Sequence, residues 1–438
     1  MKRILTSIIS IMLVIMMLLG LVACGNPTGG SELEVDAEGN TIIKIMFHVD
    51  KSSTEGQAYQ KRIDAFNAAY KDQKIKAQAI FKARSAGASG YETELQNNQI
   101  EGTLADIITF DAPNTAAYAS SGLLYDISNL ISAEDQAQFY SLNKYNGKLY
   151  GLPIQESSAG FFYNKKIFRD AGIDVSAYTA ENPWTFAQFK DVCARLKSHG
   201  VVPVDMRIDA TKDETAPYLL YPFIYAAGGD FVSADGYTAT GYYNSSATAK
   251  GFQFIKDLID AGYTSYSIDA TDFFTGKVGM YLSSGWTIPE LDNKYKESFA
   301  SRDDWGLLPY PKDVAAASAT GSWSYAITNN HHEDKTAIVE LLKWMTSAES
   351  TKAITDATGM IPARKDVVTN YAVGSPEYTL LKQLELSGRE RPVTVAYPTF
   401  STTFNQIIYN LGTSSVADLL NDATSTLQSQ MDKLKAQQ

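Results

Sequence analysis

The chain has 438 residues, which is too long for one hydrophobic core and predicts two lobes or domains. Its composition, 45% hydrophobic and 20% charged, is typical of a folded globular protein and argues against disorder. The formal net charge of −11 repels phosphate backbones, so we do not expect nucleic acid as a partner.

The N-terminus combines two basic residues, an apolar run and a cysteine. Lys2 and Arg3 precede an apolar run over residues 4–23, whose last three residues begin the sequence LVACG at residues 21–25. This resembles the bacterial lipobox, in which a small residue precedes the cysteine that carries the lipid. The run is also long enough to span a bilayer, so an uncleaved anchor is the alternative. We predict a signal peptide over residues 1–23 and lipidation of Cys24, on the extracytoplasmic face of the cell membrane.

Residues 24–41 (CGNPTGGSELEVDAEGNT) have no apolar period and are rich in glycine and acidic residues. This composition predicts a flexible tether between the membrane and the folded body.

The body then alternates predicted strands and helices. Thr41–Phe47 and Ile75–Phe81 are short apolar runs that predict strands, as does ADIITF over residues 105–110. Between the first two, aromatic and aliphatic residues from 59 to 70 recur at helical spacing. This alternation predicts an α/β fold with mainly parallel sheets.

Amphipathic helices are predicted further along, around residues 252–263 and 338–345. Ser415 is a candidate N-cap for a C-terminal helix of about five turns, whose apolar stripe extends to Leu434. Cys193 falls on the apolar face of another helix, and we expect it to be a buried free thiol.

Motifs for catalysis and for metal or cofactor binding were not found. There is no glycine-rich phosphate loop and no G-x-S-x-G elbow, and four histidines and two cysteines predict no metal site. We expect no cofactor and no enzymatic activity. Carboxylates are numerous, so a surface-anchored glycoside hydrolase stays open as an alternative.

Aromatic side chains are frequent in this chain. The chain has 26 Tyr, 19 Phe and 5 Trp, and several lie beside turn residues. Sugar sites combine a ring face for stacking with polar groups at its edge. Core or loop packing remains the alternative for each residue. The candidates are Phe110, Asp111, Tyr218, Trp286 and Phe404.

Seven segments between about Thr41 and the C-terminus form a further pattern through their order in the chain. They are ADIITFDAPNTAAYASSGLLYDI, LYGLPIQESSAGFFYNKKIFRDAGID, NPWTFAQFKDVCARLK, FFTGKVGMYLSSGW, DWGLLPYP, GMIPARKDV and RPVTVAYPTFSTTF. In this order the segments resemble the extracellular solute-binding family that includes maltose-binding protein.

The resemblance implies a two-lobed periplasmic-binding-protein-like fold, with discontinuous lobes and a hinge. The chain would cross near residues 153–158, near 305–309 and just after Pro362. The lobes would comprise residues 42–155 plus 309–362, and residues 158–304 plus 366–438.

The resemblance also implies a ligand site in the cleft. Phe110, Tyr218, Trp286 and Phe404 would be stacking rings, with Asp111 as a hydroxyl acceptor. The exit loop of the first strand adds His48 and Asp50, and the PAR turn adds Arg364, which could instead be structural.

By this resemblance the protein would be the substrate-binding lipoprotein of an ABC importer. It would act as a monomer, binding a sugar or oligosaccharide and delivering it to a membrane permease. A binder of a non-sugar solute, and an adhesin or sensor, remain open besides the hydrolase.

Overall fold

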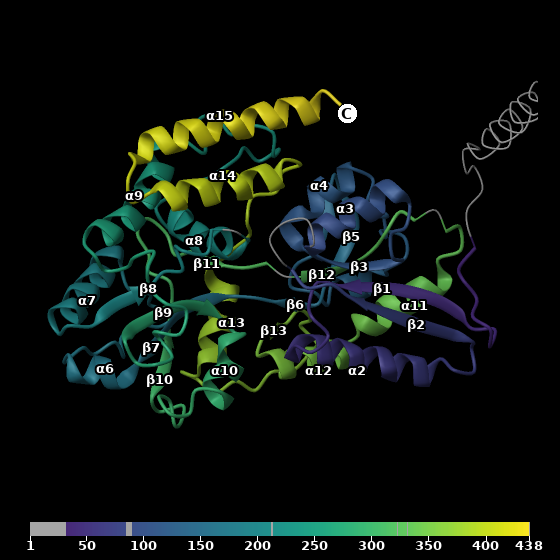
Figure 1. The fold of residues 1–438 in the computed structure, drawn as a ribbon, viewed down its shortest axis with the longest axis horizontal. Helices are drawn as coiled ribbons and strands as arrows, with labels where there is room; N and C mark the ends of the chain where they lie inside the picture. Colours follow the sequence, from purple (N-terminus) through teal and green to yellow (C-terminus); the bar gives the residue numbers. More distant parts are fainter. Residues whose placement is uncertain (1–31, 85–89, 212, 322, 331, 438) are drawn as a thin grey trace, which may run out of the picture.

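Two lobes lie side by side in the computed structural model (Figure 1), which describes residues 32–84, 90–211, 213–321, 323–330 and 332–437. Each lobe contains a β-sheet with helices packed on both faces, and strand β6 lies where the lobes meet. Within the described ranges, no helix combines the length and apolar character needed to cross a membrane.

The sheet of the first lobe has the strand order β2-β1-β3-β12-β5-β4. Strands β1 to β3 are parallel, whereas β12 runs antiparallel to both β3 and β5. In this sheet the prediction of mainly parallel strands therefore holds only for β1 to β3, because β12 enters from the other lobe in the opposite direction. The bounds are β1 Thr41–Phe47, β2 Ile75–Phe81, β3 Ile107–Asp111, β4 Asn143–Tyr145, β5 Lys148–Pro153 and β12 Trp323–Ile327.

Side chains of β1 alternate between two apolar layers, as the pleat of a strand requires. Ile43, Ile45 and Phe47 join the core beneath one set of helices, and Met46 joins the core on the other face. The first set is α2 (Thr54–Ala69), α11 (Thr336–Met345) and α12 (Ala348–Thr358). The second face carries α3 (Tyr91–Glu101) and α4 (Thr115–Ser120), and the short η1 (Ala112–Asn114) and α5 (Ala133–Gln136) complete the lobe.

The sheet of the second lobe has the order β10-β7-β9-β8. The central strand β7 is antiparallel to both neighbours, and only β8 and β9 are parallel. Phe161 and Phe162, adjacent in β7, point into cores on opposite faces. The bounds are β7 Ala159–Asn164, β8 Val202–Asp205, β9 Val278–Ser284 and β10 Trp305–Leu308.

The larger core of this lobe lies under α7 (Phe186–Ser198), α8 (Thr215–Ala226), α9 (Ser246–Asp260), α14 (Tyr397–Asn410) and α15 (Val416–Lys435). The other face carries α10 (Thr287–Asn293) and α13 (Pro376–Ser387), and α6 (Lys165–Asp170) follows β7. Ser415 caps α15 by accepting from the backbone N–H of Asp418, as expected. Cys193 is fully buried and is a free thiol.

The chain crosses between the lobes three times. The first crossing forms β6 (Gln155–Glu156), which pairs with β13 (Ile361–Pro362) of the third crossing. The second comes later than the sequence predicts, because Tyr310 and Ala319 pack in the core of the second lobe. There β11 (Ser318–Ala319) pairs with β14 (Gly388–Arg389), so the return to the first lobe follows Ala319 and not Pro309.

The predicted tether is shorter than residues 24–41. Asp36 accepts hydrogen bonds from the backbone N–H groups of Glu38 and Asn40, which closes a turn, and Leu33 packs against the core. Residues 33–40 therefore belong to the folded lobe. The predicted signal peptide and Cys24 lie outside the described residues.

Candidate functional site

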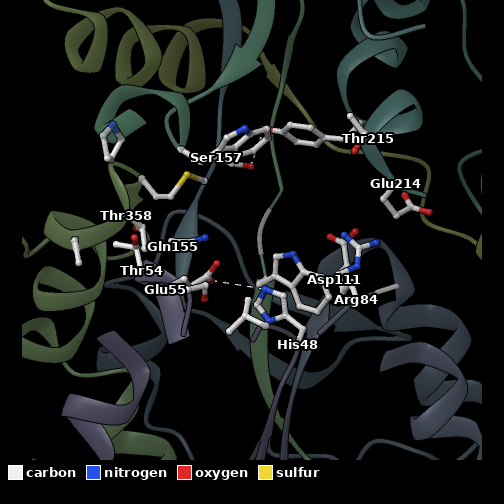
Figure 2. A pocket seen from close by; sticks show the side chains of 18 of the residues that line it. His48, Thr54, Glu55, Arg84, Asp111, Gln155, Ser157, Glu214, Thr215 and Thr358 are labelled. Carbon is white, nitrogen blue, oxygen red and sulfur yellow. Dashed lines mark hydrogen bonds and ion pairs between the residues drawn. The ribbon is translucent and has the colours of Figure 1, made fainter. Parts of the chain in front are cut away.

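A cavity of about 950 Å³ lies between the two lobes. In the first lobe, its wall consists of the ends of β1, β3 and α12 and the first turn of α2. In the second lobe, the wall consists of α8, α10 and the loop before α14. Figure 2 shows side chains from both lobes pointing into this space. Its volume is at the upper end of the range of roughly 300–1,000 Å³ found for small-molecule pockets.

The wall of the first lobe presents a flat pair of stacked rings. His48 and Trp323 lie parallel, with centroids 3.4 Å apart and an interplanar angle of 2°. The guanidinium of Arg84 lies 5.1 Å from the Trp323 ring. Burial, assisted by Arg84, lowers the pKa of His48 well below its usual value, so the imidazole is neutral near pH 7. His48 therefore adds an aromatic ring to this wall but no positive charge.

Glu55 lies beside this ring pair (Figure 2). Its Oε1 is 3.6 Å from Nε2 of His48 and accepts a hydrogen bond from the Tyr59 hydroxyl. Burial raises the pKa of Glu55, with the Tyr59 bond acting in the opposite direction.

The wall of the second lobe carries another pair of rings. Tyr218 of α8 and Trp286 before α10 have centroids 5.9 Å apart and an interplanar angle of 44°. The Tyr218 hydroxyl donates to Oγ of Ser157 at 2.8 Å, and burial raises the pKa of Tyr218 to about 12. The Tyr218 hydroxyl is thus neutral, and its hydrogen bond to Ser157 holds the ring in place. Trp286, by contrast, is 41% exposed.

Three charged side chains meet at one end of the cavity. Arg391, from the loop between β14 and α14, donates to both carboxylate oxygens of Asp111, at 2.6 and 2.9 Å. It also donates to Glu214 at 2.8 Å, just before α8. Asp111 ends β3 of the first lobe, so this network spans the cleft.

The described lining residues include five carboxylates and three cations, and each cation has an acidic partner. Arg84 pairs with Glu92 at 3.1 Å, and Lys294 lies 3.9 Å from Glu290. The third cation is Arg391 in the network above. The three cations are therefore all paired, and the wall has two more carboxylates than cations.

Two polar atoms of lining residues are buried without a hydrogen-bond partner in the protein. They are Nε of Arg391, a donor, and Oε1 of Gln155, an acceptor. Both atoms are themselves shielded from the cavity, so they are unpaired positions within the wall and not points of ligand contact.

Four of the seven predicted ligand residues line this cavity: Asp50, Asp111, Tyr218 and Trp286. Asp50 lies in the exit loop of β1, where its carboxylate accepts from the backbone N–H of Ser52. His48, predicted from the same loop, is buried in the wall.

The other three do not line it. Phe110 is 1% exposed and packs beneath Gly151, because β3 directs alternate side chains inward. Phe404 is fully buried among Phe231, Phe252 and Phe400, on the core face of α14. Arg364 pairs with Asp135 and Asp366 and lies 5.0 Å from the Phe139 ring, which gives it contacts within the first lobe.

Sequence reasoning missed Trp323 and Arg391. Trp323 is the first residue of β12 and lines the cavity because it directly follows the second crossing between the lobes. The sequence predicted this crossing near residues 305–309, so Trp323 was not recognised as a residue at the cleft. Arg391 lies in a polar stretch, GRERP, with no periodicity to mark it. Its partners come from residues 111 and 214, so no local pattern could identify it.

Among the described residues, no group of three or more His, Cys, Asp or Glu side chains could hold a metal ion. The cavity wall consists instead of rings, hydroxyls, amides and paired charges.

Residues 50–352 match the sequence profile of the bacterial extracellular solute-binding proteins. The chain belongs to this family. The membership confirms the family expected from the seven sequence segments, and with it a binding protein and not an enzyme.

Curated relatives of this solute-binding protein differ in what they bind. A binding protein of Brucella abortus (strain 2308) is 25% identical over 67% of this chain and 71% of its own length. The maltooligosaccharide ABC transporter solute-binding lipoprotein of Streptococcus pneumoniae (strain ATCC BAA-255 / R6) is 24% identical over 81% and 79%. The sn-glycerol-3-phosphate-binding periplasmic protein UgpB of Escherichia coli (strain K12) is 22% identical over 57% and 56%.

Solved structures confirm the two-lobed fold. The cyclic alpha-maltosyl-1,6-maltose binding protein from Arthrobacter globiformis has a TM-score of 0.74 and 24% identity, over 90% of this chain and all of that one. The sugar-binding protein MalE from Xanthomonas citri has a TM-score of 0.73 and 15% identity, over 90% and 98%.

Proposed function

We propose that this protein is the substrate-binding lipoprotein of an ABC importer, which binds a sugar or oligosaccharide between its lobes and delivers it to a membrane permease. The observation that carries the proposal is that both walls of one cavity contain aromatic side chains, His48 with Trp323 and Tyr218 with Trp286. The apolar faces of a pyranose stack on such rings. Asp50 and Asp111 are proposed as acceptors for ligand hydroxyl groups.

Polar groups of the wall support a ligand with hydroxyl groups. Asp50, Gln155 and Ser157 line the cavity, and a ligand hydroxyl can donate to the carboxylate and exchange hydrogen bonds with the amide and the hydroxyl. An aromatic hydrocarbon would bury such groups without partners, at a cost of about 1–3 kcal/mol each.

The charge of the wall favours a neutral ligand over a phosphate ester such as the one named for UgpB. Five carboxylates face three cations, and each cation already has an acidic partner. A phosphate would compete with these carboxylates and would meet a wall of excess negative charge. The maltooligosaccharide-binding relative therefore gives the better chemical comparison.

Calorimetric titration tests the proposal. Maltose, maltotriose, maltotetraose and a cyclic maltosaccharide form the panel, and sn-glycerol-3-phosphate is the matched anionic control. We expect saturable binding of at least one saccharide, none of the phosphate, and no release of shorter products. Tight binding of the phosphate alone would overturn the assignment, and turnover would indicate the hydrolase.

The lipid anchor at Cys24 is part of the same proposal and rests on the LVAC sequence after an apolar run. Metabolic labelling with a fatty acid should mark the protein in the cell membrane. In the Cys24→Ala variant we expect the label to be lost, with protein released or left as precursor. Unchanged labelling would contradict lipidation at this residue. We also propose a monomer, which light scattering of the purified protein checks.

A further inference from the structure

Arg391 occupies an unusual position for a charged side chain. It is 5% exposed, yet it lines both the main cavity and a second one of about 50 Å³ behind it. Its guanidinium carbon lies 5.4 Å from the Tyr218 ring and 5.9 Å from the Tyr397 ring. A buried cation in the wall of a cleft requires strong partners.

The partners within the second lobe hold Arg391 in place. Glu214 accepts its hydrogen bond at 2.8 Å and is itself bound by the hydroxyls of Tyr397, at 2.6 Å, and Ser401. These groups all belong to the second lobe, so their contacts with Arg391 do not require the first lobe.

The partner in the first lobe is Asp111, which accepts two hydrogen bonds from the outer nitrogens of Arg391, at 2.6 and 2.9 Å. Among ion pairs whose residues are both described, this is the one that joins the lobes. A bidentate guanidinium–carboxylate pair fixes orientation as well as distance. Because both side chains are at most 6% exposed, solvent and salt weaken the pair little.

We propose that Arg391 is a positioning residue that links the two lobes. Its ion pair with Asp111, called the clasp below, sets how far the cleft closes, and Glu214 holds the Arg391 side chain in place within the second lobe. Closure of a hinged protein depends on the free-energy difference between the open and closed states. Contacts with the ligand contribute one part of this free-energy difference. The Arg391–Asp111 ion pair contributes a second part, which is present also in the ligand-free protein.

The structure provides a matched pair of variants. Asp111→Asn removes the charge that pairs across the cleft, and Glu214→Gln removes the charge that pairs within one lobe. Both carboxylates lie within hydrogen-bond distance of Arg391 and both line the cavity. Only the first change weakens the link between lobes.

Small-angle X-ray scattering of the ligand-free protein tests the clasp directly. We expect a larger radius of gyration for Asp111→Asn than for the parent, and a parental value for Glu214→Gln. Equal values in all three proteins would overturn the proposal. Equal opening by both variants would overturn it too, because the network would then only support the Arg391 loop.

Arg391→Lys is the second variant, in case the neutralised Asp111 disturbs folding. Lysine keeps the charge but cannot bind a carboxylate through two nitrogens, so we expect an intermediate radius of gyration with a parental circular dichroism spectrum. A parental radius for this variant would show that bidentate pairing is not what sets closure.

Ligand affinity gives an independent readout that rests on the proposed function. With maltotriose and maltotetraose, Asp111→Asn should lose affinity by the same factor for both, on the order of 10- to 100-fold, because closure is shared by all ligands. A loss confined to one saccharide would contradict the clasp. Because Asp111 is also proposed as a hydroxyl acceptor, scattering of the ligand-free protein, in which no ligand contact contributes, separates the clasp from a direct contact. If no saccharide binds the parent, the proposed function fails, and scattering still decides the clasp.

Discussion

Trp286 keeps 41% of its surface exposed at the cavity wall, whereas Phe404, on the core face of α14, has none. The two rings therefore differ in what they stabilise. An exposed ring in a cleft contributes to ligand binding, and a buried ring contributes to the free energy of unfolding.

Replacing Trp286 by Ala should weaken saccharide binding by about 30- to 1,000-fold. Stacking beyond simple burial contributes about 0.5–1.5 kcal/mol, and lost burial raises the total to roughly 2–4 kcal/mol. Calorimetric titration measures the loss, and the melting temperature should stay near that of the parent. Phe404→Ala is the control: it should cost about 3–5 kcal/mol of stability and leave the affinity of the folded protein unchanged. Reversed outcomes would show that Trp286 is a packing residue.

Glu156 is a buried carboxyl group in the crossing strand β6, with 1% of its surface exposed. It accepts a hydrogen bond from Ser141 of the first lobe and one from Thr320 of the second crossing. Burial raises its pKa to about 7, against the effect of the Ser141 bond. The folded protein thus holds a proton at Glu156 that the unfolded chain releases.

Stability should therefore fall as pH rises through this range. Between the unfolded pKa of 4.5 and the folded value of about 7, the folded state binds more protons, so the free energy of unfolding decreases with rising pH by up to about 3 kcal/mol. Denaturant melts at pH 5, 6, 7 and 8 measure this slope. Glu156→Gln cannot titrate and should flatten it. An unchanged slope in that variant would assign the titration to another group.

Helix α15 shows how a single element is held to the body. Its stripe of Val416, Leu420, Leu427 and Met431 is buried in the larger core of the second lobe, while Ser425 on the other side is exposed. It packs chiefly on α14, which follows the loop that carries Arg391. The helix therefore supports the rear of the ligand wall without touching the cavity.

Leu427→Ala should lower the free energy of unfolding by about 2–5 kcal/mol, since the removed side chain leaves a cavity in a fully buried position. Ser425→Ala, on the exposed side of the same helix, should change it by less than about 0.5 kcal/mol. Urea unfolding of the two variants measures the contrast. Similar values would mean that α15 does not pack as the structure shows.

At the scale of the whole molecule, two glycines bring the lobes together beside the third crossing. Gly285 follows β9 of the second lobe, and Gly359 ends α12 of the first with a φ of 73°. A Cβ at position 285 would clash with the carbonyl oxygen of Gly359. The close approach of these backbones therefore requires glycine.

Gly285→Ala should hinder closure of the cleft. Overpacking costs about 1–3 kcal/mol, which corresponds to a loss of saccharide affinity of roughly 5- to 150-fold. Titration measures the loss, with Gly412→Ala as the control, because a Cβ there would meet only side-chain atoms, the nearest at 3.2 Å in Tyr266. Parental affinity for Gly285→Ala would show that the lobes need not approach so closely.

The sequence by itself determined the strands and helices whose patterns are local. The bounds of β1 and β2 follow directly from short apolar runs, and the start of α15 follows from Ser415 and the stripe behind it. The order of the seven segments was sufficient to predict the family and the two lobes, because each segment is a local motif of strand and turn residues that can be recognised without knowledge of the fold. Asp111, Tyr218 and Trp286 were predicted as ligand residues from their places beside turns, and all three line the cavity, where their contact with ligand stays a prediction.

Only the tertiary structure decided which rings face the cleft and which charges meet there. Phe110 and Asp111 are neighbours in the chain, yet the pleat of β3 buries one in the core and directs the other to Arg391. The site joins β1, β3 and β12 of one lobe to α8, α10 and the Arg391 loop of the other. Ion pairs such as Asp111 with Arg391 connect positions 280 residues apart, and local sequence patterns carry no information on such a distance.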